Sequence, residues 1–204
     1  MSAPLFPDDI LFEQRLLKCA GYYAGSLNGK TSNDMHDAEG AAAIKFTQIG
    51  MQLGTFDPRS EKNIATVLPA MQVAARKILG MALTRKTATG ITCQIISGTR
   101  TYAEQNVLFK QRPKVTNAAG GQSNHNFGIA IDVGLFRNGN YLTGAGKGDE
   151  QAYIDLAQAV KAQVPGIEWG GDWKSIVDRP HYQLATGKTL AQVRTLFEAG
   201  KLTF

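Results

Sequence analysis

Cysteine and long apolar runs are scarce in this chain of 204 residues, and each shortage excludes a class of protein. The two cysteines, Cys19 and Cys93, are too far apart for a zinc ribbon, and both lie in apolar patterns that predict core positions instead of a disulfide. No apolar run reaches the roughly 20 residues of a membrane-spanning helix, so we expect no membrane insertion. Residues 1–14 lack a basic start followed by an apolar stretch, which predicts synthesis in the cytoplasm without a secretory signal.

Positive charge is concentrated in the second part of the chain. Residues 1–77 carry eight basic and eight acidic side chains, whereas the rest carries fourteen basic and nine acidic ones. This surplus suits an anionic partner, such as a cell-wall polymer, a membrane surface or a nucleic acid, although a solvated basic face gives the same count. Because no stripe of basic and aromatic residues and no recognition motif is present, we expect no nucleic-acid partner. No coiled-coil pattern or apolar stripe is evident either, which favours a monomer.

The first third of the chain predicts three short helices. Apolar residues recur at helical spacing over residues 9–23, 38–51 and 56–68, with turn-forming residues between the first two. Asp57-Pro58 opens the third helix, and Pro69 interrupts the pattern after it. We therefore predict a small helical domain over residues 1–69 and a second domain over residues 70–204.

The second domain mixes helices and strands. Helical patterns cover residues 70–83, 100–112 and 152–164, and β-branched or alternating patterns predict strands over 91–98, 126–136 and 180–185. This irregular order favours an α+β fold, with a small antiparallel sheet and flanking helices, over a doubly wound sheet.

One histidine of this domain lies in "SNHNFGIAID", seven residues before an aspartate. His125 and Asp132 occupy this segment, and the domain's other histidine, His181, lies in "DRPHYQL". Two imidazoles and one carboxylate are a usual ligand set for catalytic zinc, with a fourth position left for water. A strand histidine is also a common polar residue without a metal, and Asp132 alone suits a turn before Gly134. The pattern by itself leaves both interpretations open.

A second carboxylate stands close to His181. Zinc hydrolysis needs a base that takes a proton from water and passes it to the leaving group. Asp178 precedes His181 by three residues, and Pro180 fixes the turn between them. Asp178 is therefore the candidate base, and the spacing excludes the helical His-Glu-x-x-His class of zinc proteases.

Three motifs resemble one family of zinc peptidases. "SNHNFGIAID", "DRPHYQ" and "ISGTRTYAEQNVLF" are similar to signatures of the D-alanyl-D-alanine carboxypeptidases and L-alanyl-D-glutamate endopeptidases. The resemblance covers about the last 130 residues. It implies zinc on His125, Asp132 and His181, and Asp178 as general base. For the remaining motif positions, it implies a substrate-facing role of Arg100 at the developing oxyanion, and substrate binding by Ser123 and Gln105.

The resemblance also bears on which bond is cut. Members that cleave D-Ala-D-Ala usually have Glu where this chain has Asp178, while phage-type endopeptidases have Asp. We therefore expect cleavage between L-Ala and D-Glu of the peptidoglycan stem peptide, with a D,D-carboxypeptidase as the alternative. A non-catalytic wall-binding protein is an alternative of another class, although a structural metal site needs neither Asp178 nor Arg100.

The predicted helical domain resembles a peptidoglycan-binding domain found beside many wall-degrading enzymes. The matching segments are "GYYAGSLNG", "AAAIKFTQ" and "FDPRSEKNIATVL", whereas "TSNDMHDAEG" departs from the usual Gly-Pro and threonine. We therefore expect an endolysin or bacterial wall hydrolase that acts on the cell wall after release from the cytoplasm.

Overall fold

The computed structural model describes residues 7–204 and has the α+β fold predicted from the sequence. The chain forms two compact units. Unit 1 contains the described residues up to Gln48, together with Arg100–Gly128 and Thr186–Phe204, and unit 2 contains Ile49–Thr99 and Ile129–Ala185. Each unit is described by itself below.

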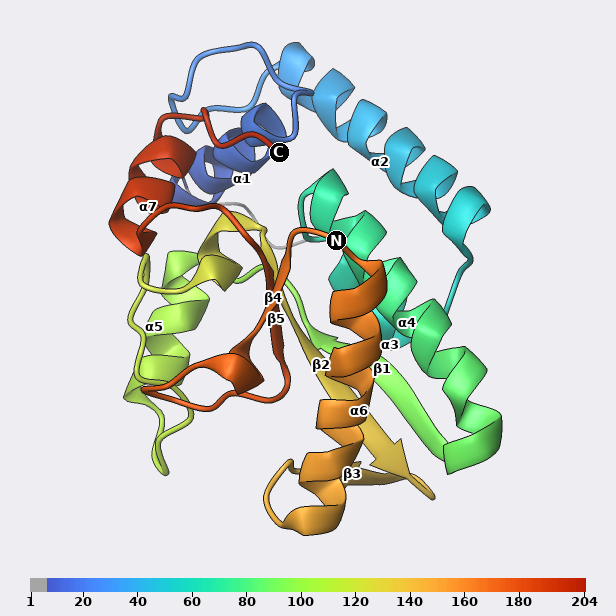
Figure 1. The fold of residues 1–204 in the computed structure, drawn as a ribbon. Coiled ribbons are helices and arrows are strands. Elements are labelled where there is room, and N and C mark those ends of the chain that lie inside the picture. Colours follow the sequence, from blue (N-terminus) through green and yellow to red (C-terminus); the bar gives the residue numbers. More distant parts are fainter. Residues whose placement is uncertain (1–6) are drawn as a thin grey trace. The chain divides into compact units, whose positions relative to one another are not determined.

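Unit 2 holds an antiparallel sheet of five strands. The spatial order is β1-β2-β5-β4, and β3 pairs with the far end of β2 (Figure 1). The strands are β1 (Ile91–Ser97), β2 (Ala130–Arg137), β3 (Asn140–Leu142), β4 (Ile167–Trp169) and β5 (His181–Leu184). The short β5 lies between β2 and β4, so its side chains can meet those of both neighbours.

Helices α4 (Pro69–Thr89) and α6 (Lys147–Gln163) pack side by side against this sheet (Figure 1). Both present apolar residues at helical spacing, and the positive φ of 66° at Gly90 ends α4 immediately before β1. The buried core of the unit includes the large side chains Ile64, Met71, Ile78, Ile95, Ile131, Tyr153 and Tyr182.

The short helix α3 (Pro58–Ile64) is fixed to β1 by buried polar contacts. Its N-cap is Asp57, whose side chain accepts a hydrogen bond from the Ser60 amide. The Ser60 hydroxyl accepts from the Ile95 amide at 2.9 Å, and the Asn63 side chain donates to the Ile95 carbonyl at 2.8 Å. These bonds join the third predicted helix to the sheet.

Unit 1 contains α1 (Pro7–Cys19), most of α2 (Asn33–Leu53), α5 (Tyr102–Lys110), the 3-10 helix η1 (Asn124–Phe127) and α7 (Leu190–Glu198). Its buried residues include a cluster from α1, α2 and the segment between them, namely Ile10, Leu17, Tyr23, Met35 and Ala38. Aromatic contacts among Phe12, Tyr102, Phe127 and Phe197 connect α1, α5, η1 and α7.

The N-terminal third forms three helices, as the sequence predicts. The domain boundary at Pro69 and a separate wall-binding function of residues 1–69 stay predictions. Residues 1–6 of that range lie outside the described part.

The structure also corrects the extent of one predicted strand. Residues 124–127 form η1, so β2 begins at Ala130 and not at Asn126. The strands β3 and β4, and helix α7, were not predicted.

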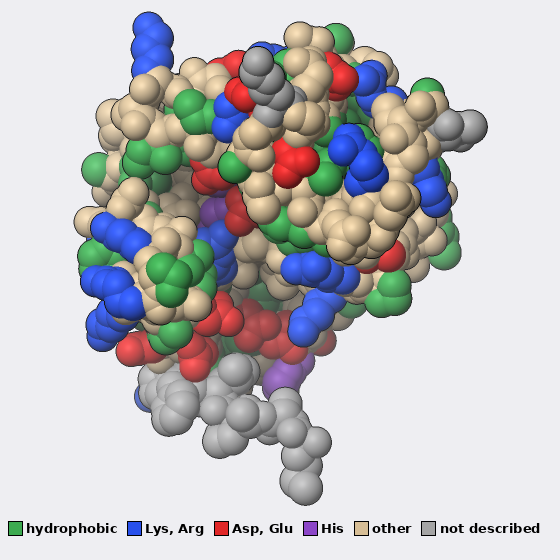
Figure 2. All heavy atoms as spheres, turned by 90° about the horizontal axis from the view of Figure 1, so that it is seen from below, with side chains coloured by type: hydrophobic (Ala, Val, Ile, Leu, Met, Phe, Trp, Pro, Cys, Tyr) green, Lys and Arg blue, Asp and Glu red, His purple; other side chains and the backbone are tan. Residues whose placement is uncertain are grey.

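Within residues 7–204 no helix combines the length and apolarity needed to cross a membrane. On the face shown in Figure 2, lysine and arginine side chains are interspersed with acidic and neutral ones.

Candidate metal centre

Asp132 and His181 face each other on adjacent strands. They are paired residues in the register of β2 and β5, and Asp132 Oδ1 lies 3.4 Å from His181 Nδ1. The histidine is buried and the aspartate is half-buried. The sheet register therefore places a carboxylate and an imidazole together through backbone pairing, which restricts their freedom before any ligand binds.

His125 lies on η1, just before β2. The Ser123 side chain caps η1 by accepting from the His125 amide, and Gly128 ends it with a φ of 69° that favours glycine. His125 is buried at 2% exposure. One ligand atom each of His125, Asp132 and His181 lies within 4.8 Å of the other two. The three residues predicted from the sequence as metal ligands are thus close together in space.

The donor set fits a metal cation. Imidazole nitrogen and carboxylate oxygen are ligands of zinc, and two histidines with one carboxylate are found at catalytic zinc sites with an open position. The short distance between the Asp132 oxygen and a ring nitrogen of His181 also favours a cation at this place, because both atoms carry lone pairs unless the ring is protonated.

The pKa of His181 also indicates that positive charge is favoured at this place. Burial disfavours its charged form and is the largest single influence, but the hydrogen bond and the charge of Asp132 oppose it. Together with Gln183 and Asp178 they raise the pKa of His181 above its ordinary value. The surroundings of this imidazole therefore favour its positively charged form, although the ring is buried.

The candidate base Asp178 is held by the loop between η2 (Gly170–Asp172) and β5. Its amide donates to the Gly170 carbonyl at 3.0 Å, and its carbonyl accepts from the His181 amide at 3.3 Å. The indole of Trp169 donates to the Arg179 carbonyl at 2.7 Å, and Arg179 pairs with Glu150 on α6. The loop therefore fixes the backbone of Asp178 close to His181, while its side chain stays partly exposed.

Arg100 is joined to η1 through the backbone. Its amide donates to the His125 carbonyl at 3.1 Å, and its carbonyl accepts from the Asn126 side chain at 2.9 Å. Its guanidinium donates to Gln105 Oε1 at 2.9 Å, and Gln105 in turn donates to the Ala118 carbonyl at 2.9 Å. Gln105 is fully buried, so its contacts favour a role in positioning Arg100 over direct contact with a substrate.

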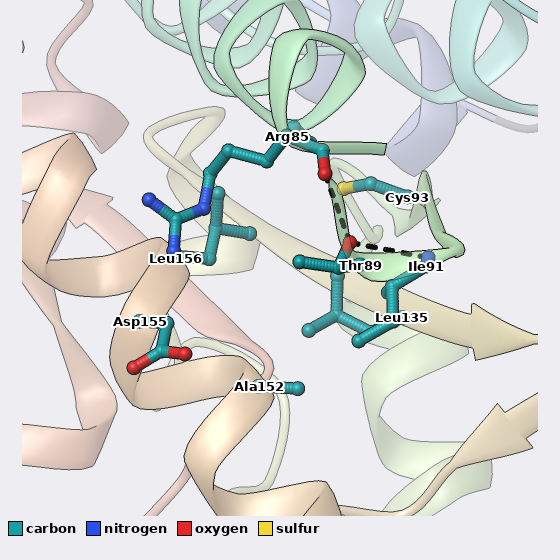
Figure 3. A pocket seen from close by; sticks show the side chains of 9 residues that line it. Arg85, Thr89, Ile91, Cys93, Leu135, Ala152, Asp155 and Leu156 are labelled. Atoms are coloured by element: carbon teal, nitrogen blue, oxygen red, sulfur yellow. Dashed lines mark hydrogen bonds between the residues drawn. The ribbon is translucent and has the colours of Figure 1, made fainter. Parts of the chain in front are cut away.

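A separate pocket of unit 2 contains none of the predicted site residues. It is lined by side chains of α4, β1, β2 and α6, including Arg85, Cys93 and Asp155 (Figure 3). Burial is the main cause that raises the pKa of the Cys93 thiol to about 12. At neutral pH this cysteine is a thiol, which is a poor nucleophile, and the pocket does not resemble a cysteine-peptidase site.

Three contacts of the site were not predicted from the sequence. Gln183 Oε1 lies 3.0 Å from His181 Nε2, and Gln183 Nε2 donates to Glu168 at 2.7 Å. The ring of Trp173 lies 5.0 Å from that of His181. The sequence held a signal for the first contact, because residues two apart on a strand share a face. The partners Glu168 and Trp173 depend on the pairing of β4 and on the loop after it.

Residues 116–184 match the sequence profile of a family described as D-alanyl-D-alanine carboxypeptidase. This segment includes His125, Asp132, Asp178 and His181, and the match confirms the family resemblance predicted for this part of the chain.

Two relatives carry names that specify the bond they cut. Over 103 residues, the chain is 39% identical to the peptidoglycan L-alanyl-D-glutamate endopeptidase CwlK of Bacillus subtilis (strain 168). This alignment covers 47% of this chain and 62% of CwlK. Over 125 residues, it is 30% identical to the L-alanyl-D-glutamate peptidase of Listeria phage A118, covering 61% of this chain and 40% of that protein. The chain thus spans less than two thirds of the length of either relative.

Two solved structures are similar as well. The L-Ala D-Glu endopeptidase ChiX of Serratia marcescens aligns with 28% identity and a TM-score of 0.48, over 63% of this chain and 88% of ChiX. A variant of the vancomycin resistance D,D-pentapeptidase VanY from a VanB-type cassette, solved in complex with Zn(II), aligns with 16% identity and a TM-score of 0.39. That alignment covers 64% of this chain and 78% of VanY.

Proposed function

We propose that this chain is a zinc-dependent peptidase of peptidoglycan, because residues 116–184 match the sequence profile of a peptidase family. The observation that carries the proposal is the convergence of His125, Asp132 and His181, whose ligand atoms lie within 4.8 Å of one another. These three residues would hold the zinc ion. When bound, zinc would activate water and polarise the scissile carbonyl group.

Asp178 acts as the general base and acid. A carboxylate beside the reacting water accepts its proton and returns it to the leaving amine, which otherwise departs as an unstable anion. The backbone bonds of Asp178 to Gly170 and His181 support this role, because they limit how far the carboxylate can move from the candidate ligands.

Arg100 stabilises the negative charge that develops on the carbonyl oxygen. A guanidinium suits this task because it stays charged and donates in a fixed plane. Gln105 supports it by accepting from one guanidinium nitrogen, which restricts the rotation of that plane. We assign Gln105 to positioning in this way. Ser123 combines its cap on η1 with a substrate contact at the rim of the site.

The substrate is the stem peptide of peptidoglycan, and the bond is that between L-Ala and D-Glu. CwlK and the Listeria phage A118 peptidase, which are 39% and 30% identical to this chain where they align, are named for this cleavage, and both support it. Asp178 supports it too, because its side chain is one methylene shorter than the Glu usual in D-Ala-D-Ala-cleaving members. The description of the matched family favours the second candidate, a D,D-carboxypeptidase.

We propose that residues 1–69 bind the cell wall and raise the local concentration of the peptidase on an insoluble polymer. The enzyme acts there as a monomer of the endolysin or wall-hydrolase type, after release from the cytoplasm.

Digestion of purified peptidoglycan tests the proposal. The chain is incubated with the wall alone, with a chelator, and as Asp178→Asn, and the released fragments are identified by mass spectrometry. New N-terminal D-Glu, lost in both controls, is the expected result. Release of terminal D-Ala alone would support the carboxypeptidase, and a wall that is bound but never cut would support a binding protein.

A further inference from the structure

The register of three strands places four polar side chains in a row. Asp132 is paired with His181 across β2 and β5, and Glu168 is paired with Gln183 across β4 and β5. His181 and Gln183 are two residues apart on β5 and therefore point to the same face of the sheet. Contacts run along the whole row, from Glu168 to Gln183 at 2.7 Å, to His181 at 3.0 Å and to Asp132 at 3.4 Å.

The chemistry of the groups determines which side chain donates and which accepts in each hydrogen bond of this row. A carboxylate only accepts hydrogen bonds, so the side-chain group of Gln183 that meets Glu168 is the NH2. The amide oxygen of Gln183 then faces His181, and an oxygen can only accept, so Nε2 of His181 carries the proton that lies between them. With Nε2 protonated, the neutral ring has its lone pair on Nδ1, the nitrogen that faces Asp132.

We infer that Glu168 and Gln183 are positioning residues that favour a proton on Nε2 of His181, so that the metal would bind at Nδ1, the nitrogen that faces Asp132. This inference rests on the proposed function, because it assigns the two residues to the same zinc site. A ligand histidine usually donates its other ring N–H to a carboxylate, carbonyl or water, and such partners set the ring orientation. Here an amide carries that contact and a carboxylate orients the amide.

Packing around the row limits alternative arrangements. Ala130, the residue of β2 paired with Gln183, is buried and its small side chain leaves room for the amide. The Trp173 ring, 5.0 Å from the His181 ring, restricts rotation of the imidazole. Because β5 is an inner strand, backbone pairing on both edges fixes the spacing between the four side chains.

Zinc affinity measured by competition with a chromophoric chelator is the first test. We expect Gln183→Met, which keeps the length of the side chain but removes its polar atoms, to weaken zinc binding by about 10- to 100-fold. Glu168→Gln should weaken it less, since an amide at 168 permits either orientation of Gln183. Gln158→Met, on an exposed position of α6, is the matched control and should leave the affinity unchanged.

A swapped double variant separates this role from a merely structural one. In Glu168→Gln combined with Gln183→Glu, the amide at 168 donates to the new carboxylate, which still accepts from His181 Nε2–H. The bond between positions 168 and 183 is reversed, but the acceptor that faces His181 Nε2–H and the net charge of the row are kept, so the affinity should return to within a few-fold of the wild type. If Gln183 served only to pack β5, Gln183→Met, which keeps the length of the side chain, would cause no loss of affinity for the swapped variant to restore.

The tautomer of His181 is the second test, and it needs no metal. Without metal, Asp132 is a competing acceptor at Nδ1, so the measurement uses Asp132→Ala. Nitrogen-15 NMR at a pH where the ring is neutral should find the proton on Nε2 in Asp132→Ala and a mixture of tautomers when Gln183→Met is added. A wild type that binds no zinc, together with the Nε2–H tautomer in Asp132→Ala, would contradict the proposed function while supporting the row itself. Zinc affinity that is unchanged in Gln183→Met, or a proton on Nδ1 in Asp132→Ala, would overturn the inference.

Discussion

Gly170 and Asp178 approach each other closely at the edge of the candidate site. The Asp178 amide donates to the Gly170 carbonyl at 3.0 Å, and a Cβ placed on Gly170 would overlap the carbonyl oxygen of Asp178 and lie 3.1 Å from Cβ of His181. The glycine is therefore required because a side chain cannot fit between the η2 turn and the loop that carries the candidate base.

The first prediction follows from this contact. Gly170→Ala should push the Asp178 backbone away from His181 and lower kcat/KM for peptide cleavage by roughly 10- to 100-fold, because small displacements of a catalytic group are costly. Gly148→Ala is the control, since a Cβ there meets no atom within 4 Å on an exposed part of α6. Steady-state kinetics and thermal unfolding of both variants test it, and wild-type kcat/KM in Gly170→Ala would contradict it.

Much of the fold followed from local sequence patterns. The predicted helices and the strands that became β1, β2 and β5 rest on periodicity over five or more residues, which short segments cannot supply. Strands β3 and β4 have three residues each and leave no such pattern. Helix α7 did have a signal, because Thr189 and Gln192 form a capping box ahead of the buried Val193.

The candidate ligands could be predicted because a resemblance named them, but their geometry could not. Pairing of Asp132 with His181 joins residues 49 positions apart, and pairing of Glu168 with Gln183 depends on β4. Neither register is encoded in the spacing of the residues along the chain. The sequence predicted that Gln105 binds substrate, because it does not show that Gln105 is buried. That burial results from the packing of unit 1.

Metal removal gives a second prediction. Zinc that binds the folded chain alone stabilises it, by about 2.7 kcal/mol when its concentration is 100 times the dissociation constant. A chelator should therefore lower the Tm of the wild type, and added zinc should restore it. His125→Ala should have a Tm that responds to neither treatment, whereas His36→Ala, at an exposed position of α2, should respond as the wild type does. An equal response of all three proteins would argue against zinc at this site.

A third prediction concerns the buried ion pair of α3 and α4. The Arg76 guanidinium is 1% exposed and donates to both carboxylate oxygens of Glu61, each at 2.8 Å, and to the Gly54 carbonyl at 2.7 Å. Glu61→Gln leaves a buried charge without its counter-ion and should lower the free energy of unfolding by about 3 kcal/mol.

The exposed pair of Lys161 and Asp172 is the control for this prediction. Asp172→Asn should change the free energy of unfolding by less than about 1 kcal/mol, because solvent screens the pair. Replacing both partners, the buried Arg76 and the partly buried Glu61, with Arg76→Met and Glu61→Leu should recover much of the loss. Urea unfolding of the four proteins measures these differences, and equal losses in Glu61→Gln and Asp172→Asn would refute the argument.

The last prediction is that the free energy of unfolding depends on pH through the titration of Tyr102. Burial is the main cause that raises the pKa of its hydroxyl to about 12, and the charge of Glu198, together with the hydrogen bond between them at 3.1 Å, adds to the effect. Arg194 and Arg15 act in the opposite direction. Since the pKa in the unfolded chain is about 10, the unfolded state loses its proton first as the pH rises. The stability contributed by Tyr102 is therefore complete below pH 10 and is lost between about pH 10 and 12.

Tyr102→Phe removes this titration, so the free energy of unfolding of the variant should fall less steeply than that of the wild type over the same interval. The difference should be on the order of 1–2 kcal/mol, reduced from the full shift because the hydroxyl is only partly buried. Comparison of the two proteins is needed because burial also raises the pKa of Cys19, to about 11, and that thiol titrates in the same range. Urea unfolding at pH 9, 10 and 11 measures both slopes, and parallel slopes would show that Glu198 and the surrounding residues leave the Tyr102 hydroxyl with its ordinary acidity.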